Sequence, residues 1–377
     1  MKIVDVRTTL LNQKNDVVVQ DGVHTVAGRD VLLVEVDTDE GVNGLGFLTG
    51  LEIAFGSEMR SIDLIIREGL RPLVVGEELF RTEWIWDRLY RGTLRFGRRG
   101  AAVRAISGVD LAIWDAIGKV QGRPLWQILG GYREKVPAYV TCGFYSEGKG
   151  LDGLVEEAVR HVREGFTGIK IKVGKGSITE NVDRVRAVRE AVGDDVKLMV
   201  DANGAWDTLA AVHMVKKLEP FDLHWVEEPV APDNLEGYQA VAAASSIPIA
   251  AGESDYTRYD FKELIQRKVV GVIQLDAARC GGVTEWMKIA HMAEAFGIPC
   301  APHAVQELHV QLAAAVPNAI FVEYYSQDHP LQRFLDQLFL EPKETKVQEA
   351  GYLLPPTRPG WGLQIDPRVV ERHRVMG

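Results

Sequence analysis

Residues capable of acid–base and metal chemistry recur at similar intervals along the second half of the chain. They are Lys170, Lys172, Asp201, Asn203, Glu227, Glu228, Glu253, Asp276, His303 and Glu323. Successive groups are about 25 residues apart, as in βα units, and each stands at the end of a short apolar segment. In a closed barrel of parallel strands this period collects all of them on one rim, the carboxyl-terminal face where catalysis takes place. The pattern therefore predicts one polar site.

Three of these carboxylates, Asp201, Glu227 and Glu253, stand on three consecutive segments. Their side chains can converge on one point if the segments are neighbouring strands. Carboxylate oxygens, with room for water and substrate oxygens, suit Mg²⁺, whereas Zn²⁺ would prefer His or Cys ligands. The other interpretation is three separate surface carboxylates. We disfavour it because burying an unpaired charge in an apolar strand costs several kcal/mol.

Lys170 and Lys172 are two positions apart in the segment GIKIKV, so both side chains point to the same face of a strand. A lysine with an ordinary pKa of about 10.4 is almost fully protonated at neutral pH. A second lysine and a divalent cation nearby would lower that pKa and make a lysine usable as a base. The alternative is an edge strand with one solvated polar face, which the carboxylates on the neighbouring segments disfavour.

His303 on the seventh segment is preceded by Asp276 on the sixth. A carboxylate on the adjacent strand can fix the tautomer of an imidazole and raise its basicity. The usual alternative is a core histidine that is hydrogen-bonded to a backbone carbonyl. With a metal between them, lysine and histidine would be two bases on opposite sides of a bound substrate, so that a carbon could lose a proton on either face.

The elements that must position these residues alternate short apolar strands with amphipathic helices. The eight candidate strands are VPAYVTC, GIKIKV, VKLMVDA, LHWVEEP, IPIAAGE, VVGVIQLD, IPCAPHA and AIFVEYY. Between the second and third, residues 179–192 carry valines at helical spacing, and Gly193 supplies a stop. Eight such units predict an α/β fold with a closed parallel barrel. A doubly wound open sheet is the alternative, but the sequence has no Gly-rich phosphate-binding fingerprint that opens a first helix.

The first part of the chain has a different pattern. It predicts strands over 1–11, 29–38 and 42–48, followed by helices over 57–70, 77–90 and 101–122. Strands followed by a block of helices indicate an α+β domain. We therefore expect an N-terminal α+β capping domain over 1–131, a catalytic barrel domain over 132–345, and a C-terminal segment over 346–377 that returns to the capping domain.

Composition narrows the range of partners and compartments. The chain has 43 Lys plus Arg against 53 Asp plus Glu, a formal charge of −10, which argues against nucleic acid or anionic membrane surfaces as principal partners. No segment reaches the roughly 20 apolar residues of a membrane span. The N-terminus lacks the apolar core and cleavage site of a signal peptide. The three cysteines, Cys142, Cys280 and Cys300, are widely spaced, as expected for reduced thiols in the cytoplasm.

At the chemically active residues the chain resembles the enolase superfamily, and within it the mandelate racemase subgroup. The resemblance covers nearly the whole chain and rests on order and spacing, since each motif alone is weak. Its motifs are Lys170-x-Lys172, Asp201-Ala202-Asn203, Glu227-Glu228-Pro229, Gly252-Glu253-Ser254, Asp276 with Gly281-Gly282, His303, Glu323, the segment ISGVDLAIWDAIGK, and Leu129-Gly130-Gly131. The resemblance implies a modified TIM barrel, (β/α)7–8, beneath the capping domain.

The resemblance also implies roles for single residues. Asp201, Glu227 and Glu253 would hold Mg²⁺. Lys172 would be one acid/base, and His303, oriented by Asp276, would be the other. Lys170 would neutralise the substrate carboxylate and lower the pKa of Lys172. Glu323, if protonated, would donate a hydrogen bond to the developing enediolate, and Asn203 would contact the substrate.

The chemistry common to the family is abstraction of the proton α to a carboxylate, through an enediolate intermediate that a metal stabilises. We expect dehydration of an acid sugar to a 2-keto-3-deoxy acid, a step of carbohydrate acid catabolism. The alternative is racemisation or epimerisation of a 2-hydroxy acid; a barrel that binds sugar acids without catalysis is a weaker one. A metal-dependent hydrolase would want an early His-x-His pair, which this sequence lacks. Muconate cycloisomerases, with a lysine in place of the His–Asp dyad, match less well. The resemblance further implies a homo-oligomer.

Two loops of the capping domain are expected to close over the substrate. The first, over 15–30, contains His24 and Arg29, which could bind hydroxyls or a distal carboxylate. The second, over 49–57, offers the apolar residues Leu51, Ile53 and Phe55, which would suit an aryl group. A cluster of arginines could be a solvated or interfacial patch or a distal carboxylate anchor. Its members are Arg91, Arg95, Arg98 and Arg99.

Overall fold

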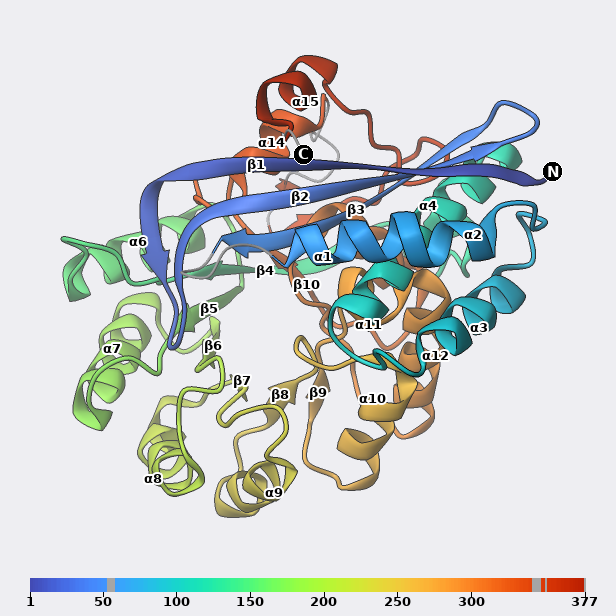
Figure 1. Ribbon diagram of the computed structural model, residues 1–377. Helices are drawn as coiled ribbons and strands as arrows, with labels where there is room; N and C mark the ends of the chain where they lie inside the picture. The colour runs from blue at the N-terminus through green and yellow to red at the C-terminus, as the bar shows by residue number, and fades with distance from the viewer. Residues whose placement is uncertain (53–57, 341–346, 350, 376–377) are drawn as a thin grey trace.

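The computed structural model describes residues 1–377 except 53–57, 341–346, 350 and 376–377. A three-stranded antiparallel sheet with its helices lies across a curled parallel sheet, and further helices surround that sheet on the outside (Figure 1). This arrangement confirms the α/β barrel with an N-terminal α+β cap that the sequence predicted.

The antiparallel sheet carries a long hairpin arm that reaches the barrel. Its strands are β1 (Ile3–Gln20), β2 (Thr25–Thr38) and β3 (Asn43–Glu52). The prediction of a loop over 15–30 is therefore wrong, because β1 and β2 continue through most of it. They bend toward the barrel strands β5 (Gly168–Lys172) and β6 (Lys197–Asp201) (Figure 1). Gln20 and Tyr145 exchange backbone hydrogen bonds of 2.7 and 2.8 Å. These bonds fix the tip of the arm to the chain that follows strand β4 (Val136–Cys142).

The remaining elements of the cap are helices, and the longest of them joins cap to barrel. They are α1 (Met59–Leu64), the π-helix η1 (Ile65–Leu70), α2 (Arg71–Val74), α3 (Thr82–Thr93), α4 (Ala101–Gln121) and α5 (Leu125–Ile128). In α4, Oδ1 of Asp110 accepts a 2.6 Å hydrogen bond from the hydroxyl of Thr284. The carboxylate of Asp115 accepts 2.7 Å bonds from the backbone N–H groups of Leu45 and Trp361. Since these groups are buried, α4 holds the cap in a fixed position on the barrel.

The parallel sheet closes through isolated bridges. Its strands are β4 (Val136–Cys142), β5 (Gly168–Lys172), β6 (Lys197–Asp201), β7 (Trp225–Glu227), β8 (Ile249–Ala251), β9 (Val272–Ile273) and β10 (Val322–Tyr324). β4 to β9 are neighbours in chain order, and β10 pairs with β4. Parallel bridges from Ile273 to Cys300 and from Cys300 to Ala319 connect β9 with the chain leading into β10. The predicted seventh strand is thus reduced to the bridge at Cys300.

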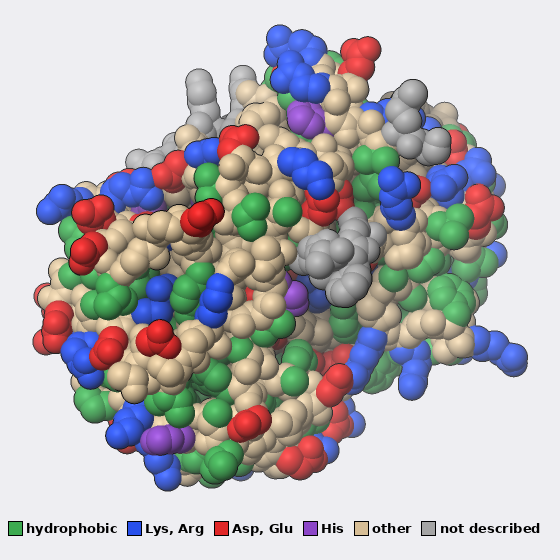
Figure 2. All heavy atoms as spheres, turned by 60° about the vertical axis from the view of Figure 1, so that its left-hand side comes forward, with side chains coloured by type: hydrophobic (Ala, Val, Ile, Leu, Met, Phe, Trp, Pro, Cys, Tyr) green, Lys and Arg blue, Asp and Glu red, His purple; other side chains and the backbone are tan. Residues whose placement is uncertain are grey.

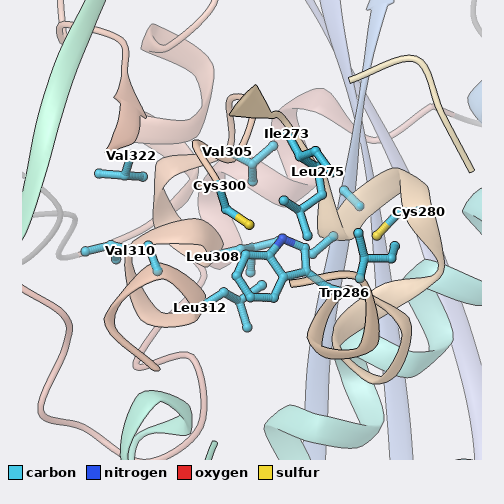
Figure 3. Packing of buried hydrophobic residues seen from close by; sticks show 14 of the residues in the cluster. Ile273, Leu275, Cys280, Trp286, Cys300, Val305, Leu308, Val310, Leu312 and Val322 are labelled. Atoms are coloured by element: carbon cyan, nitrogen blue, oxygen red, sulfur yellow. The ribbon is translucent and has the colours of Figure 1, made fainter. Parts of the chain in front are cut away.

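Helices cover the outside of this barrel. They are α6 (Leu151–Arg163), α7 (Ile178–Val192), α8 (Thr208–Leu218), the 3₁₀ helix η2 (Glu219–Phe221), α9 (Leu235–Ala244), α10 (Thr257–Gln266), α11 (Ala277–Cys280), α12 (Gly282–Ala295), α13 (Gln306–Ala315) and α14 (Arg333–Leu338). The helix predicted over 179–192 is α7. It begins at a capping box in which Ser177 and Glu180 satisfy each other's backbone N–H groups. Trp286 of α12 packs with Leu308 and Leu312 of α13 beneath Ile273 (Figure 3).

The C-terminal segment contacts the N-terminal sheet. Its elements are β11 (Val347–Glu349), β12 (Tyr352–Leu353) and α15 (Pro367–His373). After α15 the N–H of Val375 donates a 2.9 Å hydrogen bond to the carbonyl of Leu10 in β1. This contact supports the expected return to the cap. The domain boundaries stay a prediction, and the one placed at 345 lies outside the described residues.

The surface shows no large patch of one charge on the face drawn in Figure 2, where acidic and basic side chains are interspersed. In the described part of the chain, no helix combines the length and apolar character needed to cross a membrane. The cysteines Cys142, Cys280 and Cys300 are free thiols, and all three are buried.

Candidate active site

Three carboxylates meet at the carboxyl ends of adjacent strands. Asp201 and Glu227 are the last residues of β6 and β7 and are lateral neighbours in the sheet, and Glu253 follows β8. One oxygen of each lies within 4.8 Å of the others. Asp201 and Glu227 are fully buried, and Oε2 of Glu253 makes no hydrogen bond to any described residue. A largely buried cluster made only of carboxylate oxygens, one of which accepts no hydrogen bond from the described residues, fits a hard divalent cation such as Mg²⁺.

Neighbouring side chains hold Glu227 in place. Its Oε2 accepts hydrogen bonds from Nε1 of Trp225, at 3.0 Å, and from Nε2 of Gln274, at 2.6 Å. Oδ1 of Asp201 accepts a 2.8 Å bond from the backbone N–H of Asn203. Such bonds fix the orientation of a carboxylate for metal binding. Trp225 and Gln274 could not be singled out from the sequence, because both have the pattern of ordinary strand residues.

The backbone turns sharply just after these strands. Asn203, Glu228 and Ala304 have φ angles of 48°, 36° and 48°. Non-glycine residues rarely adopt this left-handed conformation, which costs free energy and concentrates at functional sites. Asn203 and Glu228 closely follow the metal-site carboxylates Asp201 and Glu227, so this backbone strain is concentrated beside the triad.

The two lysines of β5 lie beside the carboxylates, as their spacing predicted, and each forms an ion pair with one of them. Nζ of Lys170 lies 2.6 Å from Oε1 of Glu227, and Lys172 forms an ion pair with Asp201. Both lysines are buried. Burial acts to lower the pKa of Lys172, but the charge of Asp201 and the nearby Tyr325 outweigh it and raise that pKa. The charge of Lys170 acts to lower the Lys172 pKa, as predicted, and the lowering expected from a divalent cation stays a prediction.

Glu323 of β10 is an acceptor of hydrogen bonds here. Its oxygens accept from Nζ of Lys170 at 2.8 Å, from the backbone N–H of Ala304 at 2.6 Å and from the hydroxyl of Thr141. Burial raises the pKa of Glu323, but the charges of Lys170 and His303 outweigh burial and lower it. A protonated Glu323 that donates a hydrogen bond, as the resemblance implied, is not the form that these contacts stabilise.

His303 and Asp276 form a hydrogen-bonded pair beside the metal site. Nδ1 of His303 lies 3.1 Å from Oδ2 of Asp276, and Nε2 lies 3.6 Å from Oε2 of Glu253. Burial acts to lower the pKa of His303, but Glu253 and Asp276 raise it to about 9. His309 stabilises this pair through two hydrogen bonds. Its Nε2 accepts a 3.0 Å bond from the N–H of the residue after Asp276, and its Nδ1 donates to the carbonyl of the residue after His303.

A cavity of about 650 Å³ opens above these residues, between barrel and cap. From the predicted set it is lined by His24, Arg29, Lys172, Asn203, Glu253, Asp276 and His303. The other four, Lys170, Asp201, Glu227 and Glu323, lie beneath it in the barrel. His24 contacts Asp21 in the turn of the hairpin arm, and Nη1 of Arg29 donates to the carbonyl of Leu331.

The second predicted loop contributes Leu51 to the cavity, whereas Ile53 and Phe55 lie outside the described residues. The arginine cluster over 91–99 is absent from the described lining of the cavity. Arg99 instead forms exposed ion pairs with Asp233 and Asp260. The possible role of this cluster as an anchor for a substrate carboxylate is therefore not supported.

Several residues that line the cavity belong to no motif that the sequence shows. They are Asp21, Glu58, Arg104, Phe144, Arg279 and Tyr325. Arg279 lies three positions after Asp276, which could have drawn attention to it. Arg104 lies inside a helix whose pattern does not reveal which side faces the cavity.

Lysine and histidine flank the carboxylate triad at opposite ends, since Lys172 contacts Asp201 and His303 lies beside Glu253. A substrate bound at the triad would thus have a proton donor or acceptor on each side. The fold and the site together define an α/β-barrel protein with a cation site between two acid/base side chains.

Comparison with known proteins identifies the family. Residues 4–130 match the family described as mandelate racemase/muconate lactonizing enzyme, N-terminal domain, and residues 153–369 match the one described as enolase C-terminal domain-like. The chain belongs to the enolase superfamily, in its mandelate racemase subgroup, and is an enzyme of that group. The resemblance drawn from its motifs is confirmed.

Individual relatives are similar over almost their whole length. An arabinonate dehydratase of Saccharolobus solfataricus is 37% identical over 352 residues, which cover 92% of this chain and 91% of that protein. The structure of a racemase from Streptomyces coelicolor with bound magnesium has a TM-score of 0.91 and 32% identity, covering 99% of this chain and 100% of that one. An L-talarate dehydratase of Polaromonas, complexed with Mg and L-glucarate, has a TM-score of 0.88 and 34% identity, covering 100% and 98%.

Proposed function

We propose that this enzyme dehydrates a sugar acid to a 2-keto-3-deoxy acid, starting with removal of the proton α to the carboxylate. The observation that carries the proposal is the placing of Lys172 and His303 at opposite ends of the carboxylate triad, in contact with Asp201 and Glu253. The dehydratases among its relatives support this reaction.

In this proposal Asp201, Glu227 and Glu253 hold one Mg²⁺, which when bound acts as a Lewis acid toward the substrate carboxylate. Lys170, whose charge is buried beneath the cavity, adds electrostatic stabilisation of the negative charge that develops on that carboxylate. Asn203, at the edge of the cavity, contacts the substrate.

Proton transfer is assigned to the two flanking side chains. One of them takes the proton from C2. The C3 hydroxyl then leaves as water after it receives a proton from His303 or Lys172, and the resulting enol tautomerises to the 2-keto acid. Asp276 holds the His303 ring in the orientation that this step needs.

Racemisation or epimerisation at C2 is the second candidate, because the same two-sided arrangement allows the proton to return to the opposite face. The structural similarity to a racemase supports this second candidate. Both reactions share the first step, so they differ only in whether a C3 hydroxyl leaves.

One experiment tests the first step and separates the two outcomes. The protein is incubated with Mg²⁺ and a panel of mono- and dicarboxylic sugar acids in heavy water, and 2-keto acids and α-deuterium are measured together. Keto acid supports dehydration, and deuterium uptake without keto acid supports racemisation or epimerisation. Neither signal with any acid, in protein shown to bind Mg²⁺, would refute the proposed function.

A further inference from the structure

Three arginines line the cavity, and the proton transfers proposed above require none of them. Arg29 comes from β2, Arg104 from α4 and Arg279 from α11. Arg29 and Arg104 are buried, at 6% and 2% exposure. In each of the three, the Nε atom is buried without a hydrogen-bond partner among the described residues. A buried guanidinium with an unused donor is costly unless a ligand pairs with it.

Arg104 is only partly neutralised. Its Nη2 donates a 2.6 Å hydrogen bond to the carbonyl of Thr49, and Nη1 contacts the carboxylate of Glu58, whose side chain is 44% exposed. Burial and the charge of Arg279 lower the pKa of Arg104. Both guanidinium groups line the same cavity, where the charge of Arg279 opposes that of Arg104 and Glu58 favours it.

Arg279 has a neutral partner. Its Nη1 donates a 3.1 Å hydrogen bond to the hydroxyl of Tyr256, and within the described ranges no carboxylate forms an ion pair with it. The carboxylate of Asp276 lies nearby but is used by His303 and by the N–H of Ala278. Burial acts to lower the pKa of Arg279, but Tyr256 and the charges of Asp276 and Glu58 outweigh burial and raise it. Arg279 thus stays charged, while its Nε donor has no hydrogen-bond partner among the described residues.

We propose that Arg104 and Arg279 form a subsite for a second carboxylate, so that the substrate is a dicarboxylic sugar acid, anchored at one end by the metal site and at the other by these arginines. This inference rests on the proposed function and narrows its substrate class. The contact of Glu58 with Arg104 shows that the subsite accepts a carboxylate. Planar guanidinium groups pair with carboxylates through two parallel hydrogen bonds, which gives both affinity and orientation.

Binding of unreactive acids tests the subsite without requiring the correct sugar. Adipate and 6-hydroxyhexanoate have the same chain length and no stereocentres, and they differ only in having a carboxylate or a hydroxymethyl group at the far end. Titration calorimetry with Mg²⁺ present gives the two dissociation constants. We expect adipate to bind at least about tenfold more tightly, as for a charge-assisted bidentate contact. Arg104→Met and Arg279→Met should each reduce this preference to about twofold or less.

Two further variants test whether a change in binding comes from the subsite itself, and not from a folding defect or from the loss of any one charge. Glu58→Gln removes the carboxylate that competes for Arg104, so adipate should bind about two- to fivefold more tightly than to the wild type. Arg95→Gln removes an exposed arginine outside the described cavity lining and should leave both constants unchanged. Thermal unfolding of each variant shows whether it is folded.

The outcomes separate the subsite from the reaction. Equal binding of the two acids, absence of binding by both, or weaker adipate binding in Glu58→Gln would overturn the subsite. Tighter binding of 5-phosphonopentanoate than of adipate would overturn its assignment to a carboxylate. The reaction itself fails only if no sugar acid exchanges its C2 proton, a result that does not depend on Arg104 or Arg279.

Discussion

The Nδ1 atom of His303 lies 3.1 Å from Oδ2 of Asp276, and the two residues come from successive units of the barrel. Asp276 is held by its neighbours, because its Oδ1 accepts a 2.8 Å bond from the N–H of Ala278 at the start of α11. Oδ2 is thus presented to the ring in one position, which leaves Nε2 of His303 facing the carboxylate triad. This geometry makes Asp276 a positioning residue, whose effect on the reaction is exerted through His303.

Asp276→Asn should therefore lower kcat by about a hundredfold or more, the contribution expected of an oriented acid/base group. An asparagine can keep the shape of the carboxylate but cannot stabilise an imidazolium. The measurement is kcat and the dissociation constant of Mg²⁺ in the same preparation. An unchanged kcat would contradict the role of Asp276, and a fall in Mg²⁺ affinity that accounts for the whole loss would show that it acts on the metal site.

Lys172→Ala and His303→Asn should differ in which substrate epimer they still exchange. Lys172 and His303 lie at opposite ends of the triad, so each reaches the proton on one face of C2. Deuterium uptake from heavy water, followed by NMR for each of a pair of C2 epimers, measures this. Equal losses on both epimers in both variants would contradict the two-sided assignment.

Glu253→Gln should weaken Mg²⁺ binding by at least about tenfold, because it removes one of three anionic ligands. Trp225 provides a readout that does not depend on activity, since its Nε1 donates a 3.0 Å bond to Oε2 of Glu227. Its fluorescence should change on titration with Mg²⁺, and Trp225→Phe should remove that change. Glu263→Gln, an exposed glutamate on α10, is the matched control. Equal Mg²⁺ affinity in Glu253→Gln and the control would refute the site.

The barrel could be predicted because its strands are buried on both faces and therefore stand out as short apolar runs, from VPAYVTC to AIFVEYY. The same reasoning placed Asp201, Glu227 and Glu253 together, since residues at the ends of adjacent parallel strands must be neighbours. The seventh strand was expected from IPCAPHA. In the structure only Cys300 of this segment pairs with its neighbours, through one bridge on each side.

The hairpin arm over 15–30 could not be predicted, because most of its residues in β1 are exposed or half-buried and show no apolar alternation. The paired states of Lys170 and Glu323 were missed for a different reason. Spacing along a strand shows which face a side chain takes, but which of several nearby charges it contacts depends on distances in the folded protein. Arg104 was missed because almost the whole of α4 is buried, so no polar face marks the cavity.

Gly46→Ala should destabilise the protein by about 1–3 kcal/mol or more, because β3 and α4 touch through their backbones at this position. A Cβ at Gly46 would lie 2.5 Å from the carbonyl oxygen of Gly108, which cannot move without shifting the helix. Gly69→Ala is the control: a Cβ there meets nothing within 4 Å, and alanine in a helix should stabilise by about 0.5–1 kcal/mol. Urea unfolding measures both. Equal effects of the two substitutions would contradict the close packing of sheet on helix.

His329 should make the protein less stable in acid. It is buried between the rings of Phe144 and Tyr325, with centroid distances of 4.9 Å to each, and its Nδ1 accepts a bond from the N–H of Leu331. Burial and the charges of Lys149, Arg29 and Lys172 lower its pKa to about 3, with Asp328 acting in the opposite direction. The folded-state pKa thus lies below the unfolded value of about 6.5.

Acid destabilises the protein because the folded-state pKa of His329 lies below its unfolded-state value. The unfolded chain binds a proton at His329 as pH falls below about 6.5, while the folded protein does not until the pH nears 3, so stability is lost across that range. His329→Asn should reduce the slope of unfolding free energy against pH there by up to about 1.4 kcal/mol per pH unit, the value for one proton. His224, whose pKa burial and Lys197 lower to about 4, retains its own contribution. Urea unfolding from pH 4 to 7 measures the slope, with the exposed His291→Asn as control. The same slope in wild type and His329→Asn would show that His329 is not the group responsible.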